Sequence, residues 1–296
     1  PMATPDPRYL SGLPVKKRIL AEVAEAIGAL SGATPLPRLV SISIGDTPEV
    51  AVYIRGQKRA AEQVGLPFDD QYWPGDITAE DAKARLVAMN DDPNVLGVIL
   101  QRPVPEHLNV RSLQGAIHPL KDVEGMNPAA IGNMVYNDTA LAPCTAAASV
   151  EMSKATGLDL HGLEVVVIGH SAIVGKPAAF MLMAEGATVT VCHHMTRSVA
   201  AHSRRADAIL VAVGIPNFIT PEMVRPGAAV IDIGINQIDD GDGGTRIVGD
   251  VDTEAVKEVA SWVTPVPGGV GPVTVAILMR NALTALRRQR ELGWTA

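Results

Sequence analysis

Apolar and polar positions alternate between helical and strand spacing along the first half of the chain. The predicted helices are residues 15–30, 54–65 and 78–93, and the predicted strands are residues 38–45 and 95–105. Gly65 is a plausible C-cap, and Thr78 with Asp81 three positions later is typical of a helix start. Strand–helix–strand repetition predicts a largely parallel sheet covered by helices.

The same alternation restarts near residue 145. Residues 163–194 contain a strand, a glycine turn, a helix and a second strand. Buried-strand patterns follow at residues 207–214 and 228–236, and residues 274–292 predict a long helix with a basic end. The succession of βα units predicts a Rossmann-type domain, so the fold class is α/β. The expected domains are residues 149–273, and residues 1–148 together with residues 274–296.

Composition and charge narrow the class of protein. Apolar residues make up 47% of the chain and charged residues 19%, which suits a packed globular protein. The net charge of −7 argues against nucleic acid or a membrane surface as a partner. No apolar run reaches the roughly 18 residues of a membrane span, and no signal pattern opens the chain, so a cytoplasmic location is expected. Cys144 and Cys192 lie far apart without CxxC spacing, and no metal site is expected.

The segment Val52–Leu66 (VYIRGQKRAAEQVGL) combines helical spacing with chemically useful side chains. Tyr53 and Gln57 lie four residues apart and therefore share one face of the helix. Lys58 follows Gln57 but is rotated by about 100° from that face. The face presents a phenol and an uncharged amide, while the lysine points elsewhere.

Two glycine-containing turns lie where open α/β sheets bind ligands. GHSAIVGKP, residues 169–177, joins a strand to a helix and is either a nucleotide site or an ordinary βα turn. TPVPGGVGPVT, residues 264–274, is either a rigid ligand-binding loop or a domain linker.

Polar residues at the ends of two predicted strands and in one predicted turn have both a functional and an ordinary interpretation. Gln101 ends a predicted strand, where ligands bind in such sheets. The charges at residues 121–124 are usually a solvated cluster. His193 and His194 follow the second Rossmann strand, near an expected ribose or as a surface pair.

These segments together resemble one family, the methylenetetrahydrofolate dehydrogenase/methenyltetrahydrofolate cyclohydrolases, from about residue 8 to 290. The resemblance covers IGDTPEVAVYIRGQKRAAEQVG, GVILQRPVP, KDVEG, APCT, VVVIGHSAIVGKP, TVTVCHHMT, VIDIGIN and TPVPGGVGPVTVAILM. It implies an N-terminal domain completed by the C-terminal helix, an inserted Rossmann domain and a folate cleft along their seam. It also implies a homodimer and a nicotinamide cofactor, usually NADP.

The resemblance also assigns roles to residues. Tyr53 would stack on the pterin, and Gln101 would hydrogen-bond near the reacting centre. The implied catalytic residues are Tyr53, Gln57, Gln101 and Asp122. The implied substrate contacts are Val50, Tyr53, Gln101, Glu124, Pro267, Gly268 and Gly271. The implied cofactor contacts are Gly169, His170, Ser171, Ile173, Val174, His194, Arg197, Gly214, Ile235 and Thr274.

Four positions depart from the family pattern. The family typically has lysine where this chain has Gln57, and serine where it has Val50. Glu124 replaces a pterin-binding aspartate, and His170 replaces the arginine of Gly-Arg-Ser. Because an amide does not titrate near neutrality, the prediction is a dehydrogenase with weak or absent cyclohydrolase activity.

Alternatives remain for both activity and cofactor. The chain could be fully bifunctional, a dehydrogenase for another one-carbon carrier, or a non-catalytic folate- or nucleotide-binding homologue. NADP is expected because Arg197 could bind a 2′-phosphate, and His194 lies in the ribose region. His170 is only partly charged at neutral pH, so NAD remains the alternative.

Overall fold

The computed structural model describes residues 8–30, 32, 35–46, 50–241 and 244–294. It confirms an α/β fold with parallel sheets. Two compact units make up the chain. The N-terminal unit is Lys17–Cys144 with Val275–Ala296, and the Rossmann unit is Pro1–Lys16 with Thr145–Thr274.

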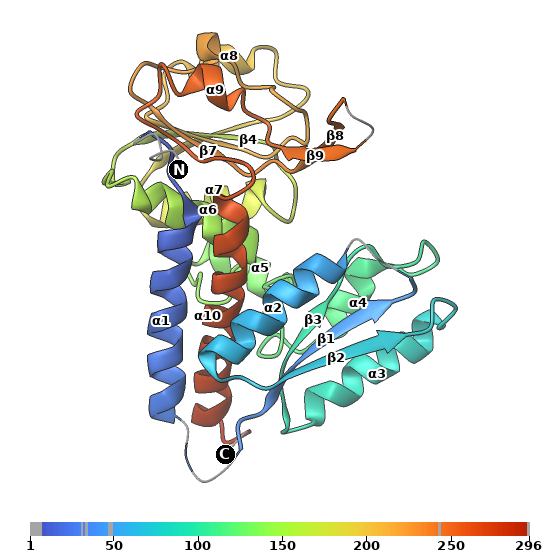
Figure 1. Cartoon of the computed structure of the whole chain (residues 1–296). Coiled ribbons are helices and arrows are strands. Elements are labelled where there is room, and N and C mark those ends of the chain that lie inside the picture. Colours follow the sequence, from blue (N-terminus) through green and yellow to red (C-terminus); the bar gives the residue numbers. More distant parts are fainter. Residues whose placement is uncertain (1–7, 31, 33–34, 47–49, 242–243, 295–296) are drawn as a thin grey trace, which may run out of the picture. The chain divides into compact units, whose positions relative to one another are not determined.

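The N-terminal unit is built on a three-stranded parallel sheet of order β2-β1-β3 (Figure 1). The strands are β1 (Arg38–Ile44), β2 (Phe68–Trp73) and β3 (Val95–Leu100); the helices that follow them in this unit are α2 (Ala51–Val64), α3 (Ala79–Asp91), α4 (Val110–Ala116) and α5 (Pro128–Val135). Leu86 of α3 and Leu113 of α4 pack with β1 and β3 in one apolar core. The sequence pattern missed β2, because FDDQYW has the polar residues of an edge strand.

Both predicted helix boundaries are confirmed. Gly65 ends α2 in the left-handed conformation, with φ at 81°. The Thr78 hydroxyl accepts the backbone N–H of Asp81 at 3.0 Å and caps α3. These local signals fix where the helices that flank the predicted site begin and end.

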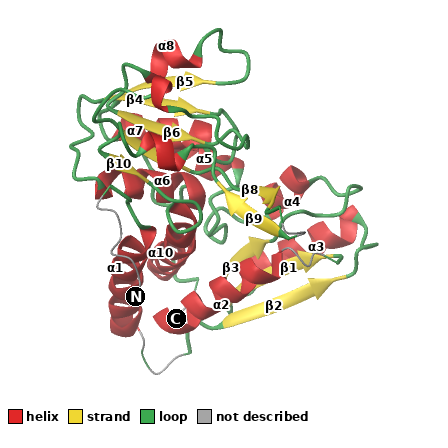
Figure 2. Ribbon diagram, turned by 45° about the horizontal axis from the view of Figure 1, so that its top comes forward, coloured by secondary structure: helices red, strands yellow, loops and turns green. Residues whose placement is uncertain are grey.

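The C-terminal helix α10 (Val270–Glu291) lies beside α1 (Gly12–Leu30) in both ribbon views (Figures 1 and 2). Its Gln289 amide donates to the carbonyls of Leu96 and Leu120 at 2.7 and 2.8 Å. α10 begins four residues before the predicted helix, so Gly271 lies in a helical first turn rather than in a loop. A proline at residue 272 is compatible with this start, since first-turn N–H groups need no helical partner.

The Rossmann unit contains a five-stranded parallel sheet of order β10-β7-β6-β4-β5 (Figure 2). Its strands are β4 (Glu164–Ile168), β5 (Thr188–Cys192), β6 (Ala208–Val211), β7 (Ala229–Asp232) and β10 (Trp262–Val263). Its helices are α6 (Cys144–Ala155), α7 (Gly175–Ala184), α8 (Val199–Ser203) and α9 (Thr253–Val256), with a short 3₁₀ helix at Pro221–Met223. An antiparallel hairpin is formed by β8 (Asn236–Asp239) and β9 (Thr245–Val248). The chain leaves β4 for β5 and returns to β6 on the other side of β4. This reversal is where doubly wound sheets bind ligands at the carboxyl ends of their strands.

The described residues before Lys16 belong to the Rossmann unit rather than to the N-terminal domain in which the sequence analysis placed them. Tyr9 forms a parallel bridge with Val263 of β10. The Leu10 N–H donates to the Val263 carbonyl, and the Val263 N–H donates to the Arg8 carbonyl, both at 2.9 Å. This pairing extends the sheet edge by one short segment, which hydropathy alone does not indicate.

Candidate active site

Three polar side chains meet in the N-terminal unit: Ser41 in the middle of β1, Gln57 on α2 and Gln101 just after β3. The Gln101 amide nitrogen donates to Gln57 Oε1 at 2.7 Å and to Ser41 Oγ at 3.1 Å. Gln57 and Gln101 are 8% and 7% exposed, whereas Tyr53, one turn earlier on α2, is 48% exposed. The arrangement is a buried amide network beside an accessible aromatic ring. Ser41 was not among the predicted residues, because a serine inside an apolar strand carries no distinctive signal.

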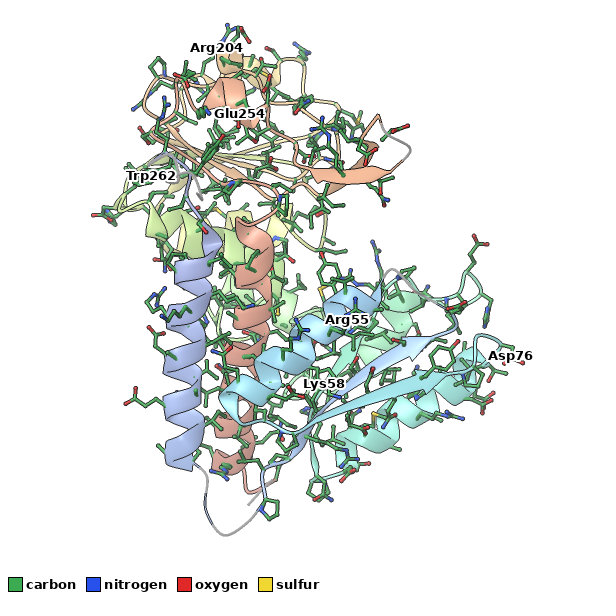
Figure 3. The ribbon with its side chains drawn as sticks, in the orientation of Figure 1. Arg55, Lys58, Asp76, Arg204, Glu254 and Trp262 are labelled. Atoms are coloured by element: carbon green, nitrogen blue, oxygen red, sulfur yellow. The ribbon has the colours of Figure 1, made fainter. Side chains whose placement is uncertain are left out.

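Lys58 does not share the environment of Gln57. It is exposed on α2 (Figure 3), while Gln57 is buried. Val50 also lies apart from the amide network. It lines a pocket of about 200 Å³ with Ser43, Asp46, Ala51, Ile54, Asp70, Gln71 and Tyr72.

The charges at residues 121–124 are not the solvated cluster that their composition suggests. Lys121 and Asp122 are each 2% exposed. The Lys121 ammonium donates to the carbonyls of Met89 and Asp92 at 2.9 and 2.6 Å, at the end of α3. Asp122 accepts the Asn127 N–H at 2.5 Å. Lys121 therefore has structural partners at the end of α3 and Asp122 has one in this turn, and the catalytic role of Asp122 stays a prediction.

The two carboxyl groups of this turn are easier to protonate than usual. Burial raises the pKa of Glu124 to about 7, with the charge of Arg102 opposing and that of Asp122 reinforcing the rise. Burial likewise raises the pKa of Asp122 to about 6, although backbone N–H groups of the turn favour its charged form. The Leu100 N–H donates to Glu124 Oε2 at 3.0 Å. Glu124 is therefore fixed against the residue that precedes Gln101.

The turn after β4 requires glycine at both ends. Gly169 has φ at 111°, and a Cβ there would lie 2.2 Å from the Ala212 carbonyl oxygen. A Cβ on Gly175 would lie 1.9 Å from the Gly169 carbonyl oxygen. Ser171 Oγ accepts the Val174 N–H at 3.1 Å at the start of α7. The backbone can thus approach a phosphate at this helix end, which fits a dinucleotide.

The remaining predicted cofactor residues lie along the same unit. Ile235 and Arg197 are exposed, whereas Ile173 and Thr274 are half-buried. Gly214 follows β6 with φ at 70°. Of the predicted substrate contacts, Pro267, Gly268 and Gly271 also belong to this unit. Their contact with folate stays a prediction.

Two buried aspartates that the sequence analysis missed hold the loops after β6 and β7. Asp250 accepts the backbone N–H groups of Val213, Gly214 and Ile215 at 2.6–3.0 Å, and the Asn236 amide at 2.8 Å. Asp232 Oδ1 in turn accepts the Asp250 N–H at 3.0 Å. Asp250 therefore positions the loop that carries Gly214. It also positions Asn236, the residue that follows Ile235. The sequence signal that could have indicated this role is Asp250 in the segment VGDVD, where the hairpin ends.

Three histidines gather where β4 and β5 end. The strands pair in parallel with Ile168 opposite Cys192. The His170 and His193 rings stack with centroids 4.5 Å apart, and His194 lies 5.9 Å from His170. Burial, together with the charges of His193, Lys176 and His194, lowers the pKa of His170. The sequence analysis treated His193 and His194 as a pair and did not connect them with His170.

The fold and these sites define an α/β protein with one Rossmann unit and one unit that carries a buried amide network. The described part of the chain has no helix with the length and apolar character needed to cross a bilayer. The model of the tetrahydrofolate dehydrogenase/cyclohydrolase catalytic domain matches residues 10–124, and that of the NAD(P)-binding domain matches residues 143–290. The chain belongs to the tetrahydrofolate dehydrogenase/cyclohydrolase family.

Individual relatives agree with this assignment. The chain is 69% identical over 291 residues to bifunctional protein FolD 3 of Roseobacter denitrificans, covering 98% of this chain and 99% of the relative. A bifunctional FolD methylenetetrahydrofolate dehydrogenase/cyclohydrolase from Campylobacter jejuni superposes with a TM-score of 0.90 at 35% identity, covering 95% and 99% of the two chains. A Trypanosoma brucei enzyme of the same kind, solved with NADP and an inhibitor, gives a TM-score of 0.89 at 33% identity over 95% and 98%.

Proposed function

We propose that this protein oxidises 5,10-methylenetetrahydrofolate to 5,10-methenyltetrahydrofolate with a nicotinamide cofactor. The observation that carries the proposal is the buried Ser41–Gln101–Gln57 network beside the accessible Tyr53 ring. A flat pterin suits the face of a tyrosine. A neutral amide network can orient the one-carbon bridge by hydrogen bonds without opposing the positive charge that develops on it.

The hydride step requires orientation rather than proton transfer. A bound nicotinamide ring supplies the hydride acceptor. The contribution of this chain would be to hold the pterin on Tyr53 and the one-carbon bridge near Gln101, in a fixed orientation for the hydride step. The glycines of the turn after β4 leave room for the cofactor phosphates.

NADP is the proposed cofactor in preference to NAD. The adenosine end would lie near His170 and His194, beside Lys176 and Arg197. A 2′-phosphate dianion favours the Arg197 guanidinium and the Lys176 ammonium, whereas a 2′-hydroxyl gains little from them. Steady-state kinetics with each cofactor test this proposal. A kcat/KM for NAD equal to or above that for NADP would contradict it.

The names of the relatives favour a second activity, hydrolysis of the methenyl bridge. The relatives described above from Roseobacter and Campylobacter are called bifunctional. They support the bifunctional alternative better than the sequence prediction of weak or absent cyclohydrolase. We therefore propose that the protein catalyses both steps, and that hydrolysis proceeds with Gln57 where the family pattern has lysine.

One experiment separates the competing functions. Reduced-nicotinamide absorbance, followed with methylenetetrahydrofolate and each cofactor, reports the dehydrogenase. The decay of methenyltetrahydrofolate absorbance, with and without enzyme, reports the cyclohydrolase. Tight binding of folate and cofactor with neither signal would instead indicate a non-catalytic binding homologue.

Two further properties stay predictions. A homodimer is proposed from the family resemblance, and sedimentation of the purified chain at micromolar concentration would test it. The cytoplasmic location expected from the sequence can be tested by cell fractionation.

A further inference from the structure

The cluster of His170, His193 and His194 in the Rossmann unit can ligate a metal ion. The proposed function uses His170 and His194 as cofactor contacts and does not use this property. His170 lies two residues beyond β4, and His193 and His194 lie one and two residues beyond β5. One ring nitrogen from each residue can be chosen so that all three lie within 4.8 Å of one another. We propose that these three side chains form a binding site for a divalent transition-metal ion of the zinc, nickel or copper class.

The donor set selects the class of metal. Imidazole nitrogen is a common ligand for Zn²⁺, Ni²⁺ and Cu²⁺, whereas Mg²⁺ and Ca²⁺ require oxygen ligands. Three imidazoles leave a fourth tetrahedral position open for water or another ligand. Lys176 contributes positive charge beside His170. This charge repels any divalent cation, so only an ion that gains strong bonds to imidazole can bind here.

The three side chains must turn and approach one another to close on an ion. Zinc–nitrogen distances of about 2.0–2.1 Å place tetrahedral ligand atoms about 3.3–3.4 Å apart. The ring nitrogens must therefore approach by up to about 1.5 Å, and the His170 and His193 rings, which stack 23° from parallel, must turn so that their nitrogens point at one ion. The backbone that carries His193 is already fixed, because its N–H donates to Thr196 Oγ1 at 2.9 Å and its carbonyl accepts the Thr196 N–H at 2.8 Å.

His193 must exchange one weak contact on binding. Its Nδ1 accepts the Met195 N–H at 3.2 Å. Ligation through Nδ1 would replace this contact directly. Ligation through Nε2 would place the ring proton on Nδ1 and end the contact. Either route substitutes a metal–nitrogen bond for one long hydrogen bond.

Metal binding can be measured directly on the cofactor-free full-length protein. Calorimetric titration with Zn²⁺ should show one site, and Co²⁺ should give the visible absorption of a tetrahedral nitrogen-ligated ion. His170→Arg and His194→Ala should each weaken Zn²⁺ binding at least about tenfold, since even changes outside the ligand set cost 10–100-fold. His161→Ala, which removes an exposed histidine elsewhere in this unit, is the matched control and should bind as the unmodified protein does. Unchanged circular dichroism and melting temperatures would show that the variants are folded.

Two results would overturn the proposal. One is the lack of a Zn²⁺ site in the unmodified protein, and the other is equal affinity in the folded His170→Arg, His194→Ala and His161→Ala variants. Binding of Mg²⁺ as strong as that of Zn²⁺ would contradict the assigned metal class.

A second measurement connects the metal with the cofactor and rests on the proposed function. Because His170 and His194 are also predicted cofactor contacts, saturating NADP should weaken Zn²⁺ binding about tenfold or more. Unchanged Zn²⁺ affinity would contradict this sharing of residues. Failure of the dehydrogenase assay would leave the direct metal titration unaffected, so the two proposals fail separately.

Discussion

Replacing Gln57 by lysine tests how this active site supports two different reactions. The hydride step moves no proton, whereas opening the methenyl bridge requires water to lose protons and a ring nitrogen to gain one. A positioned acid–base group contributes about 10²–10⁴ in rate, or about 3–5 kcal/mol of barrier. We therefore expect Gln57→Lys to raise the cyclohydrolase kcat by up to this factor, and the dehydrogenase kcat to change by less than about tenfold.

The structure also predicts what the substitution costs in stability. Gln57 Oε1 accepts the Gln101 amide at 2.7 Å, and this bond would be lost. Such a bond contributes about 0.5–1.5 kcal/mol. Gln57 is 8% exposed, so the new ammonium is also partly desolvated. We expect the free energy of unfolding to fall by about 1–3 kcal/mol, which leaves a folded enzyme. Gln101 retains Ser41 Oγ as a partner at 3.1 Å.

Lys58 provides the matched control for this experiment. It is the next residue on α2 but is exposed, and Lys58→Gln should leave both activities unchanged. Both rates are measured by absorbance, and thermal melting shows that each variant is folded. A folded Gln57→Lys variant with unchanged hydrolysis would refute the reasoning that a titratable group at this position limits the step. Loss of hydrolysis in Lys58→Gln would show that the exposed lysine supplies the proton instead.

Three further predictions concern cofactor binding and pH. Gly169→Ala should raise the KM for NADP at least tenfold, because a Cβ would lie 2.2 Å from a carbonyl oxygen and the φ of 111° disfavours alanine; an unchanged KM would be inconsistent with this close packing. Asp250→Asn places an NH₂ group among four N–H donors, which removes the acceptor that holds this loop. It should raise the KM for NADP about 10–100-fold and leave the KM for folate within about threefold. Steady-state kinetics would measure both values. Burial raises the pKa of Glu124 from 4.5 to about 7, so the folded state holds this proton more tightly than the unfolded state. Its contribution to stability is complete below about pH 4.5 and is lost as pH rises to about 7, by at most about 3 kcal/mol; denaturant unfolding across this range should show the decline, and Glu124→Gln should make it smaller while leaving the part due to other buried carboxyl groups such as Asp122.

Hydropathy patterning was sufficient to predict the class of fold and much of the order of elements. The apolar runs of β3, β4, β6 and β7 were recognised because these strands are buried in parallel sheets, where an uninterrupted apolar run is expected. Helix boundaries at Thr78 and Gly65 were also predictable, because capping uses bonds to residues only a few positions away. β2 was missed because an edge strand tolerates the polar residues of FDDQYW.

The tertiary structure alone decided which distant residues share a site. Gln101 meets Ser41 and Gln57 only because β1 and β3 pair in parallel, which brings the residue that follows β3 beside β1 and α2. Helical spacing had already placed Tyr53 and Gln57 on one face. It could not show which side chain donates the hydrogen bond that the Gln57 amide oxygen accepts. Strand pairing between β4 and β5 likewise brings His170 to His193 and His194. Local sequence determines periodicity and caps, whereas contacts across a sheet depend on strand order and register, which only the folded chain specifies.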